Sequence, residues 1–395
     1  MRRFLINEEL KEMKKINAIL IFIISSFLTG CVKPFVAKVD RYANLLVVDG
    51  GITDGPGPYT VKLSTSGDVK QFSLLNPLPN CQVKVKDNIG NEYSFNEAEA
   101  GVYKSDSITF RGVPGRSYQL LVLTKDGEQI ESAMELLTTG LKIESIDAKV
   151  EHKADPDLFY GKDGYQFYLN SETFDTKDNY FLWRIQTTYK FNADYGIHSV
   201  INKSGEYKPM LYGDTLRTCY RDVTVLQILL LNAGNLNTTK INNYPLYYED
   251  NYTKALTIRY SLNVQQYKIN EAAFTYWNEI KKITDTGGDL YSTQPYQVKN
   301  NLRNKSHEEI PVLGYFMVAG IAEKRIFLNR PSIVFRYDMC RPGEPQRFVI
   351  ERMLNRPDLW PVYFAATDVG MYLLDQECVN CLLEGTQKKP SFWIE

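Results

Sequence analysis

Few residues in this chain have the type and spacing that chemistry requires, and the clearest pair is Cys378 with Cys381. These two cysteines form a CxxC motif near the end of the 395-residue sequence. A zinc site would need a second ligand pair at suitable spacing, whereas the three histidines, His152, His198 and His307, stand far apart. A thioredoxin-like motif would need an α/β context, which this segment lacks. We therefore expect structural disulfides here, with no metal and no cofactor.

Apart from Cys31, the remaining cysteines divide into one core residue and a set of disulfide candidates. Cys81 opens the alternating stretch "CQVKVK", where a small residue suits the inward face of a strand, so we expect it to stay reduced. The disulfide candidates are Cys219, Cys340, Cys378 and Cys381. Four cysteines allow three pairings, and the sequence does not choose among them.

Familiar catalytic motifs are missing from the sequence, which contains no GxSxG, Walker, GxGxxG or HExxH pattern. The stretch "DPDLFYGKDG" carries Asp155, Asp157 and Asp163, but Phe159 stands where a calcium loop needs an oxygen ligand. We read it as a polar turn. A glycosidase needs only two carboxylates at a set distance, and the 47 acidic residues neither nominate nor exclude such a pair. We therefore expect a non-enzymatic protein and keep a glycan-directed hydrolase as the alternative.

An apolar run near the N-terminus is typical of a targeting signal. Residues 16–28 form this run, and Lys14 and Lys15 precede it. It is about 13 residues long, whereas a membrane-spanning helix needs roughly 20. A positive start, a short apolar stretch and small residues before a cut describe a secretory signal peptide. We assign it to residues 1–30, with Met13 as a more natural start than Met1.

The end of this run, Leu28-Thr29-Gly30-Cys31, resembles the bacterial lipobox. In that signal the cysteine thiol receives a diacylglyceryl group, and the peptide is cut just before it. The resemblance implies lipidation at Cys31, followed by a tether over residues 31–44. Several acyl chains anchor a protein stably to a membrane, and an exported protein can keep disulfides.

The composition favours a β-rich protein with no affinity for polyanions. The net charge is −1, from 46 basic and 47 acidic residues that are scattered along the chain. We therefore expect no nucleic-acid partner. The 27 tyrosines and 19 phenylalanines are residue types that favour strands.

The fold class that we predict is mainly β, with an immunoglobulin-like β-sandwich over residues 45–138. Short stretches that alternate apolar and polar residues, such as "TVKLS" and "CQVKVK", are separated by Gly and Pro turns. "KDGE" carries an Asp-Gly hairpin signal. Strands at this spacing are typical of a sandwich of about 100 residues.

Residues 139–395 predict a larger β-rich domain with at least one packed amphipathic helix. In "YFLWRIQTTYKF" one face carries only apolar, aromatic and Thr residues. Asn270 is a good N-cap for a helix with a stripe of Ala273, Trp277 and Ile280. An Asn- and Tyr-rich stretch, "LNAGNLNTTKINNYPLYYEDNYTK", predicts a long exposed excursion.

Tyrosines of this last stretch are weak candidates for ligand binding. They are Tyr244, Tyr247, Tyr248 and Tyr252. Tyrosine rings can stack on sugars or line a peptide groove. The more common role of such rings is ordinary packing in sheets and loops.

Several stretches of the chain together have the pattern of one protein family. The stretches are "GCVKP", "LLVVDGGITDGPGPYTVKLS", "VKVKDNIGNEYSF", "GVYKS", "GRSYQLLV", "FTYWNEIKKITDTGGDLYSTQPYQVKNNL", "VLGYF", "CVNC" and "KKPSFW". With them the chain resembles the Bacteroidota lipoproteins with domain of unknown function 4249. The family is commonly encoded beside TonB-dependent outer-membrane receptors and has no established enzymatic activity, so no catalytic residue carries over.

The resemblance implies an outer-membrane-anchored lipoprotein. It would work as an accessory or ligand-binding partner of a TonB-dependent transporter in nutrient uptake, with an unknown ligand. Surface-exported lipoproteins of this phylum often have acidic residues soon after the lipidated cysteine, whereas here none precedes Asp40. Both faces of the outer membrane therefore stay open, and a structural or adhesive surface lipoprotein is a further alternative.

Overall fold

The computed structural model describes residues 44–67, 75–173, 179–210, 215–236, 240–286, 298–368 and 370–395. The predicted signal peptide over residues 1–30, the predicted lipid site Cys31 and the predicted tether before residue 44 lie outside these residues. Within them, strands dominate and helices are few, so the mainly β fold class is confirmed. None of the helices in these residues has the length and apolarity that crossing a bilayer requires.

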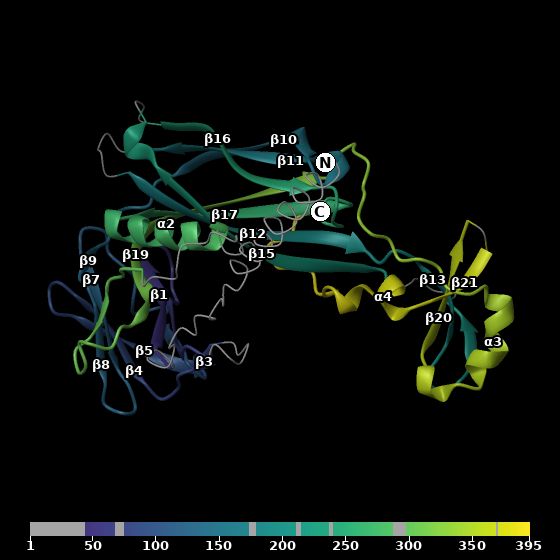
Figure 1. Ribbon diagram of the computed structural model, residues 1–395, viewed down its shortest axis with the longest axis horizontal. Helices are drawn as coiled ribbons and strands as arrows, with labels where there is room; N and C mark the ends of the chain where they lie inside the picture. Colours follow the sequence, from purple (N-terminus) through teal and green to yellow (C-terminus); the bar gives the residue numbers. More distant parts are fainter. Residues whose placement is uncertain are drawn as a thin grey trace, which may run out of the picture.

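The N-terminal region is a sandwich-like, curled sheet at the lower left of Figure 1. Its strands follow the neighbour order β1-β2-β6-β5-β4-β7-β8, with β3 beside β2 and β9 beside β7. They are β1 (Leu46–Thr53), β2 (Thr60–Thr65), β3 (Asn76–Pro77), β4 (Gln82–Asp87), β5 (Glu92–Glu99), β6 (Val102–Ser105), β7 (Ser117–Leu123), β8 (Gln129–Ser132) and β9 (Glu135–Leu136). The period-two pattern produces one apolar core, because alternate residues such as Val83, Val85 and Leu120 point inward.

The second region consists of two packed sheets. One has the order β15-β12-β17-β19 and the other β10-β11-β16. The strands are β10 (Ile143–Asp155), β11 (Leu158–Glu172), β12 (Tyr180–Asn192), β15 (Thr218–Asn232), β16 (Lys240–Asp250), β17 (Arg259–Ile269) and β19 (Leu313–Asn329). The predicted inward face of β12 is buried in the core between these sheets, where Phe181 and Trp183 join Phe167 of β11. The alternation of β12 thus places its apolar face between the two layers.

The predicted exposed excursion is wrong. Its first residues end β15, and its second half forms β16, which pairs with β11 over Lys240–Asp250. Ile241 and Leu246 are buried in the core between the sheets. The stretch carries enough apolar and aromatic side chains to stabilise an edge strand, and its many asparagines hid that pattern.

Helix α2 (Glu271–Thr286) covers the outer face of the larger sheet. Asn270 is its N-cap as predicted, because its Oδ1 accepts a hydrogen bond of 2.8 Å from the Ala273 N–H. Ala273 is buried against Leu182 of β12, and Trp277 packs at the edge of the same cluster. The predicted packed amphipathic helix is therefore confirmed.

Strand β19 belongs to both regions. Its first part pairs in parallel with β1, from Val47 opposite Leu313 to Thr53 opposite Ala319. From Gly320 onward it pairs antiparallel with β17. Another late strand, β18 (Leu302–Asn304), pairs with β8. Residues far along the chain thus complete the N-terminal sandwich.

A small third sheet extends to the right in Figure 1. Its order is β14-β13-β20-β21. Its elements and the short helices near it are β13 (Ile197–Ile201), β14 (Tyr207–Pro209), β20 (Val362–Thr367), β21 (Gly370–Leu374), α3 (Gln346–Leu354), η2 (Pro357–Leu359), α4 (Gln376–Val379) and η3 (Cys381–Leu383). A further short helix, η1 (Ala233–Asn235), follows β15.

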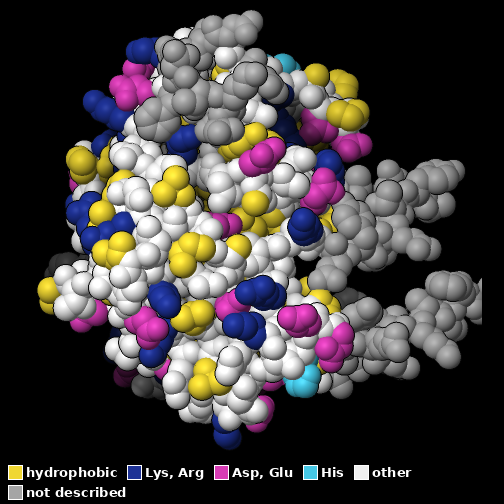
Figure 2. Space-filling view, turned by 90° about the vertical axis from the view of Figure 1, so that its left-hand side faces the viewer, with side chains coloured by type: hydrophobic (Ala, Val, Ile, Leu, Met, Phe, Trp, Pro, Cys, Tyr) yellow, Lys and Arg dark blue, Asp and Glu magenta, His cyan; other side chains and the backbone are white. Residues whose placement is uncertain are grey.

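The C-terminal tail returns from the small sheet to the body. Trp393 is buried, with its ring centroid 5.1 Å from that of Tyr220 and 5.6 Å from that of Phe327. The face of the molecule in Figure 2 shows acidic and basic side chains interspersed, with small separate groups of apolar ones.

Candidate functional site

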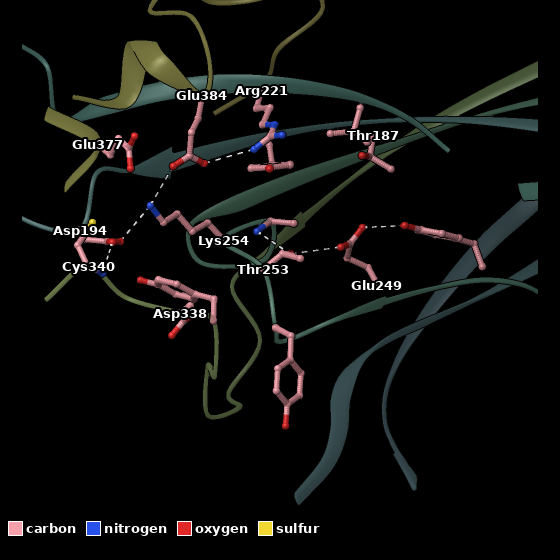
Figure 3. Close-up of a pocket in the computed structure, with 16 residues that line it drawn as sticks. Thr187, Asp194, Arg221, Glu249, Thr253, Lys254, Asp338, Cys340, Glu377 and Glu384 are labelled. Atoms are coloured by element: carbon pink, nitrogen blue, oxygen red, sulfur yellow. Dashed lines mark hydrogen bonds and ion pairs between the residues drawn. The ribbon is translucent and has the colours of Figure 1, made fainter. Parts of the chain in front are cut away.

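A cavity of about 500 Å³ lies where the two-sheet body meets the C-terminal segment. Its walls come from β12, β15, β16, the turn after β16, the loop after β19, and the segment around α4 and η3. Figure 3 shows the side chains that line it. They are mostly charged groups, threonines and tyrosines, so the cavity is polar.

Lys254 lies at the centre of this cavity. Its Nζ is 3.0 Å from Oδ1 of Asp194 and 3.4 Å from Oε1 of Glu384. The other oxygen of Glu384 is 3.3 Å from Nη1 of Arg221. The side chain of Lys254 is 12% exposed and that of Asp194 only 2%, so this pair has little contact with water. Separating the two groups would leave a charge buried and unpaired, which is costly. The pair therefore stabilises the observed arrangement of the cavity walls.

Asp194 is also held by the backbone of the opposite wall. The Cys340 N–H donates a hydrogen bond of 2.9 Å to its Oδ2. Asp194 follows β12, whereas Cys340 lies in the loop after β19. One carboxylate thus joins two segments that are distant in the sequence.

Glu249 of β16 is the second feature of the site. The phenols of Tyr247 and Tyr260 donate hydrogen bonds of 3.0 and 2.9 Å to its Oε2, and the Thr253 hydroxyl lies 3.5 Å from its Oε1. The residue as a whole keeps some exposure, but its carboxyl group is enclosed, and this burial raises its pKa. The phenol hydrogen bonds oppose that shift only in part. Burial also raises the pKa of Tyr247 and of Tyr260, so the cluster favours the protonated forms.

The structure brings two of the four predicted tyrosines to this cavity. Tyr247 and Tyr252 line it. Tyr244 instead stacks on Trp183, with ring centroids 5.0 Å apart. The hydroxyl of Tyr248 donates toward backbone carbonyl oxygens, and its ring lies beneath the Lys153 ammonium at 4.0 Å. A ligand-binding role stays a prediction for all four.

Two disulfides hold the wall that supplies Glu384. Cys378 bonds to Cys340, and Cys381 bonds to Cys219. Each cysteine of the CxxC motif therefore has a partner outside the motif. Cys81 is free and half-buried in the sandwich.

Sequence reasoning missed the charged centre of the site, because Asp194, Arg221, Lys254 and Glu384 come from separate segments. No local motif contains them. The one usable signal was the cysteines, since Arg221 lies two residues after Cys219 and Glu384 three after Cys381. A pairing of those two cysteines would have brought the charges together.

The acidic turn between β10 and β11 makes ion pairs instead of a ligand cage. Asp155 accepts from Lys162 at 2.9 Å, and Asp163 contacts His152 at 2.9 Å. Across the described ranges, no group of three or more His, Cys, Asp or Glu side chains is placed to hold a metal ion.

The fold and the site define a class of protein: mainly β, built of packed sheets, with a polar, ion-paired cavity. The chain belongs to the family with domain of unknown function 4249 (DUF4249), whose model matches residues 32–325. The match begins directly after Cys31 and includes Lys254 and Glu249, whereas Glu384 and three disulfide cysteines lie beyond it. A comparison with curated proteins gave no match.

Proposed function

We propose that the protein is an outer-membrane lipoprotein, anchored through Cys31, that binds a ligand without catalysis as the accessory partner of a TonB-dependent transporter in nutrient uptake. The observation that carries the binding function is the polar cavity around Lys254, whose walls are joined by disulfides and ion pairs. The lipobox-like residues 28–31 support the anchor. The transporter partner rests on the resemblance to a Bacteroidota lipoprotein family.

The size and rigidity of the cavity support binding. Its volume of about 500 Å³ falls within the range of roughly 300 to 1,000 Å³ that is usual for small-molecule sites. Its walls are fixed by disulfides and by ion pairs to Lys254. A preformed site loses little entropy when it binds a ligand.

The state of the carboxyl groups supports a role without hydrolysis. A glycosidase needs one protonated acid and one free carboxylate across the scissile bond. Asp194 and Glu384 both contact Lys254, and two phenols cover Oε2 of Glu249. Three carboxyl groups of the cavity, those of Asp194, Glu249 and Glu384, are therefore engaged with other residues.

Purification from solubilised membranes tests the anchor and the partner together. The full chain, expressed in its native host and extracted with detergent, is expected to co-purify with an outer-membrane transporter. A Cys31→Ala variant is expected to lose its membrane association. A wild-type protein that always purifies alone contradicts the partnership, and a Cys31→Ala protein that stays in the membrane contradicts the anchor.

One observation favours the glycan-hydrolase alternative, namely the raised pKa of Glu249 in a cavity that Glu384 also lines. A hydrolase requires that Glu249→Gln abolish the release of reducing ends from a panel of glycans. The proposed binding function predicts no such release by the wild-type chain.

For the adhesive alternative, full protection from added protease in intact cells excludes exposure at the surface.

A further inference from the structure

The charges that line the cavity do not balance. Two cations, Lys254 and Arg221, face a larger set of carboxylates besides Glu249. These carboxylates are Asp194, Asp338, Glu377 and Glu384. The surplus of negative charge lies in a concave, partly enclosed space, where fields are focused on whatever enters. We propose that this cavity binds an organic cation, a ligand carrying amine or amidinium groups, and this proposal rests on the proposed ligand-binding function.

Two of the carboxylates have no partner among the described residues. Asp338 and Glu377 make no hydrogen bond or ion pair with any other residue in the part of the chain that the structure describes. Figure 3 shows Glu377 on one side of the Asp194–Lys254 pair and Asp338 on the other. Both are exposed, so they are open to a ligand that enters from solvent. Their lack of partners leaves two charges available to bind a cation.

A third carboxylate, that of Asp194, is almost fully buried and lines the cavity. Its Oδ1 lies 3.0 Å from Lys254 Nζ and has no further partner among the described residues. A carboxylate oxygen has two acceptor positions, so one acceptor position of Oδ1 stays without a donor.

Aromatic rings beside these carboxylates suit the same ligand. Tyr252 and Tyr337 line the cavity. The Tyr337 ring already faces a cation, because the Lys254 ammonium lies 5.8 Å from its centroid. Ring faces attract cations, and most strongly those that have lost water. An organic cation can therefore use both the carboxylates and the rings.

Other ligand classes fit the cavity less well. An anion would have to displace Glu384 from both Lys254 and Arg221. A bare metal ion would need three or more ligand side chains grouped together, and the described residues contain no such group. The cavity volume of about 500 Å³ suits a molecule rather than an ion.

Calorimetric titration of the full chain in detergent tests this proposal, with spermidine as the probe and with citrate and maltose for comparison. We expect spermidine to bind and citrate and maltose to give no heat. Replacing Asp338→Asn and Glu377→Gln together is expected to weaken spermidine binding about tenfold or more. Both side chains are exposed and unpaired, so an unchanged unfolding temperature verifies that this variant is folded.

A matched control removes the same two charges elsewhere. Glu99→Gln together with Glu351→Gln alters exposed side chains of the sandwich and of α3, and spermidine affinity is expected to stay within twofold of wild type. Raising the salt from about 0.05 to 0.5 M is expected to weaken binding, because screening shortens the reach of the carboxylates.

Three results would overturn the proposal: equal spermidine binding by the cavity and control variants, binding of citrate, or binding of maltose in place of spermidine. If maltose binds and the cavity variant abolishes that binding, the organic-cation ligand is rejected, whereas ligand binding at the cavity is supported. If no transporter co-purifies from membranes, the partnership is rejected, and this result has no bearing on the organic-cation ligand.

Discussion

Asp87 of the N-terminal sandwich and Glu249 beside the cavity are both carboxyl groups taken out of water, yet their pKa values move in opposite directions. Burial alone would raise the pKa of Asp87, but hydrogen bonds from the Asn91 side chain and from the backbone of Asn91 and Ile89, together with the charge of Arg116, lower it overall. Burial raises the pKa of Glu249, and the phenols around it do not reverse this shift.

The difference shows what each region does with a buried charge. Around Asp87 the donors include a guanidinium at 3.1 Å, the Asn91 side-chain amide at 2.8 Å and two backbone N–H groups in the turn after β4. They stabilise the ionised form and close the turn. Around Glu249 the donors are neutral phenols, which satisfy a protonated carboxyl as well as an ionised one. The sandwich uses its buried carboxylate for structure, whereas the cavity keeps a proton available.

The disulfides give the largest expected difference between the two regions. Replacing Cys219→Ala and Cys381→Ala together removes a link across 162 residues, and we expect a loss of about 4 to 5 kcal/mol in the free energy of unfolding. Denaturant titration measures it. A loss below about 1 kcal/mol would show that the cavity wall stands without this bond.

Asp87→Asn is expected to cost about 2 to 3 kcal/mol, since it removes an ionised acceptor and leaves Arg116 unpaired. Glu92→Gln is the matched control, because its pair with Lys84 is exposed to solvent and exposed ion pairs contribute little to stability. The lowered pKa predicts that the contribution of Asp87 is present above about pH 4 and is lost as the pH falls through the folded-state pKa. Equal costs for the two variants would contradict the structural role of Asp87.

Glu249→Gln is expected to show the opposite pH dependence. Because the folded-state pKa of Glu249 is raised, the wild-type protein loses stability as the pH rises from about 4 to that pKa, while the unfolded chain releases its proton first. The variant lacks this loss, so its stability relative to wild type should be higher at pH 7 than at pH 4. Unfolding measured at pH 4, 5.5 and 7 checks it. If the difference in the free energy of unfolding between variant and wild type is the same at all three pH values, the raised pKa of Glu249 is contradicted.

Cys81→Ala gives the smallest expected effect, within about 0.5 kcal/mol. The thiol is free and half-buried, and its Sγ makes long contacts of 3.8 and 3.9 Å to carbonyl oxygens. Thermal unfolding under non-reducing conditions measures the change. A large loss would mean that the sandwich depends on a cysteine as much as the cavity does.

Local patterns predicted the elements well. The alternation in β12 assigned its buried face, and the Asn270 cap located the start of α2. The Asn- and Tyr-rich stretch over residues 231–254 predicted an exposed excursion, whereas its second half forms β16. A strand rich in asparagine lacks the pattern of a core strand. Two of the four predicted tyrosines line the cavity. Tyr244 and Tyr248 lie in the same Tyr-rich stretch, but they pack against other side chains and the backbone of the two sheets.

The sequence by itself determined the period-two strands, the capped helix and the number of cysteines, because these depend on neighbouring residues and on the chemistry of single side chains. Only the tertiary structure decided that β19 joins both sheets, that Cys378 and Cys381 have separate partners, and that Lys254 lies between Asp194 and Glu384. Such contacts join residues that are distant in the sequence, 38 positions apart for Cys340 and Cys378 and 162 for Cys219 and Cys381. Local periodicity contains no information about them, since the packing of whole sheets decides which distant segments meet.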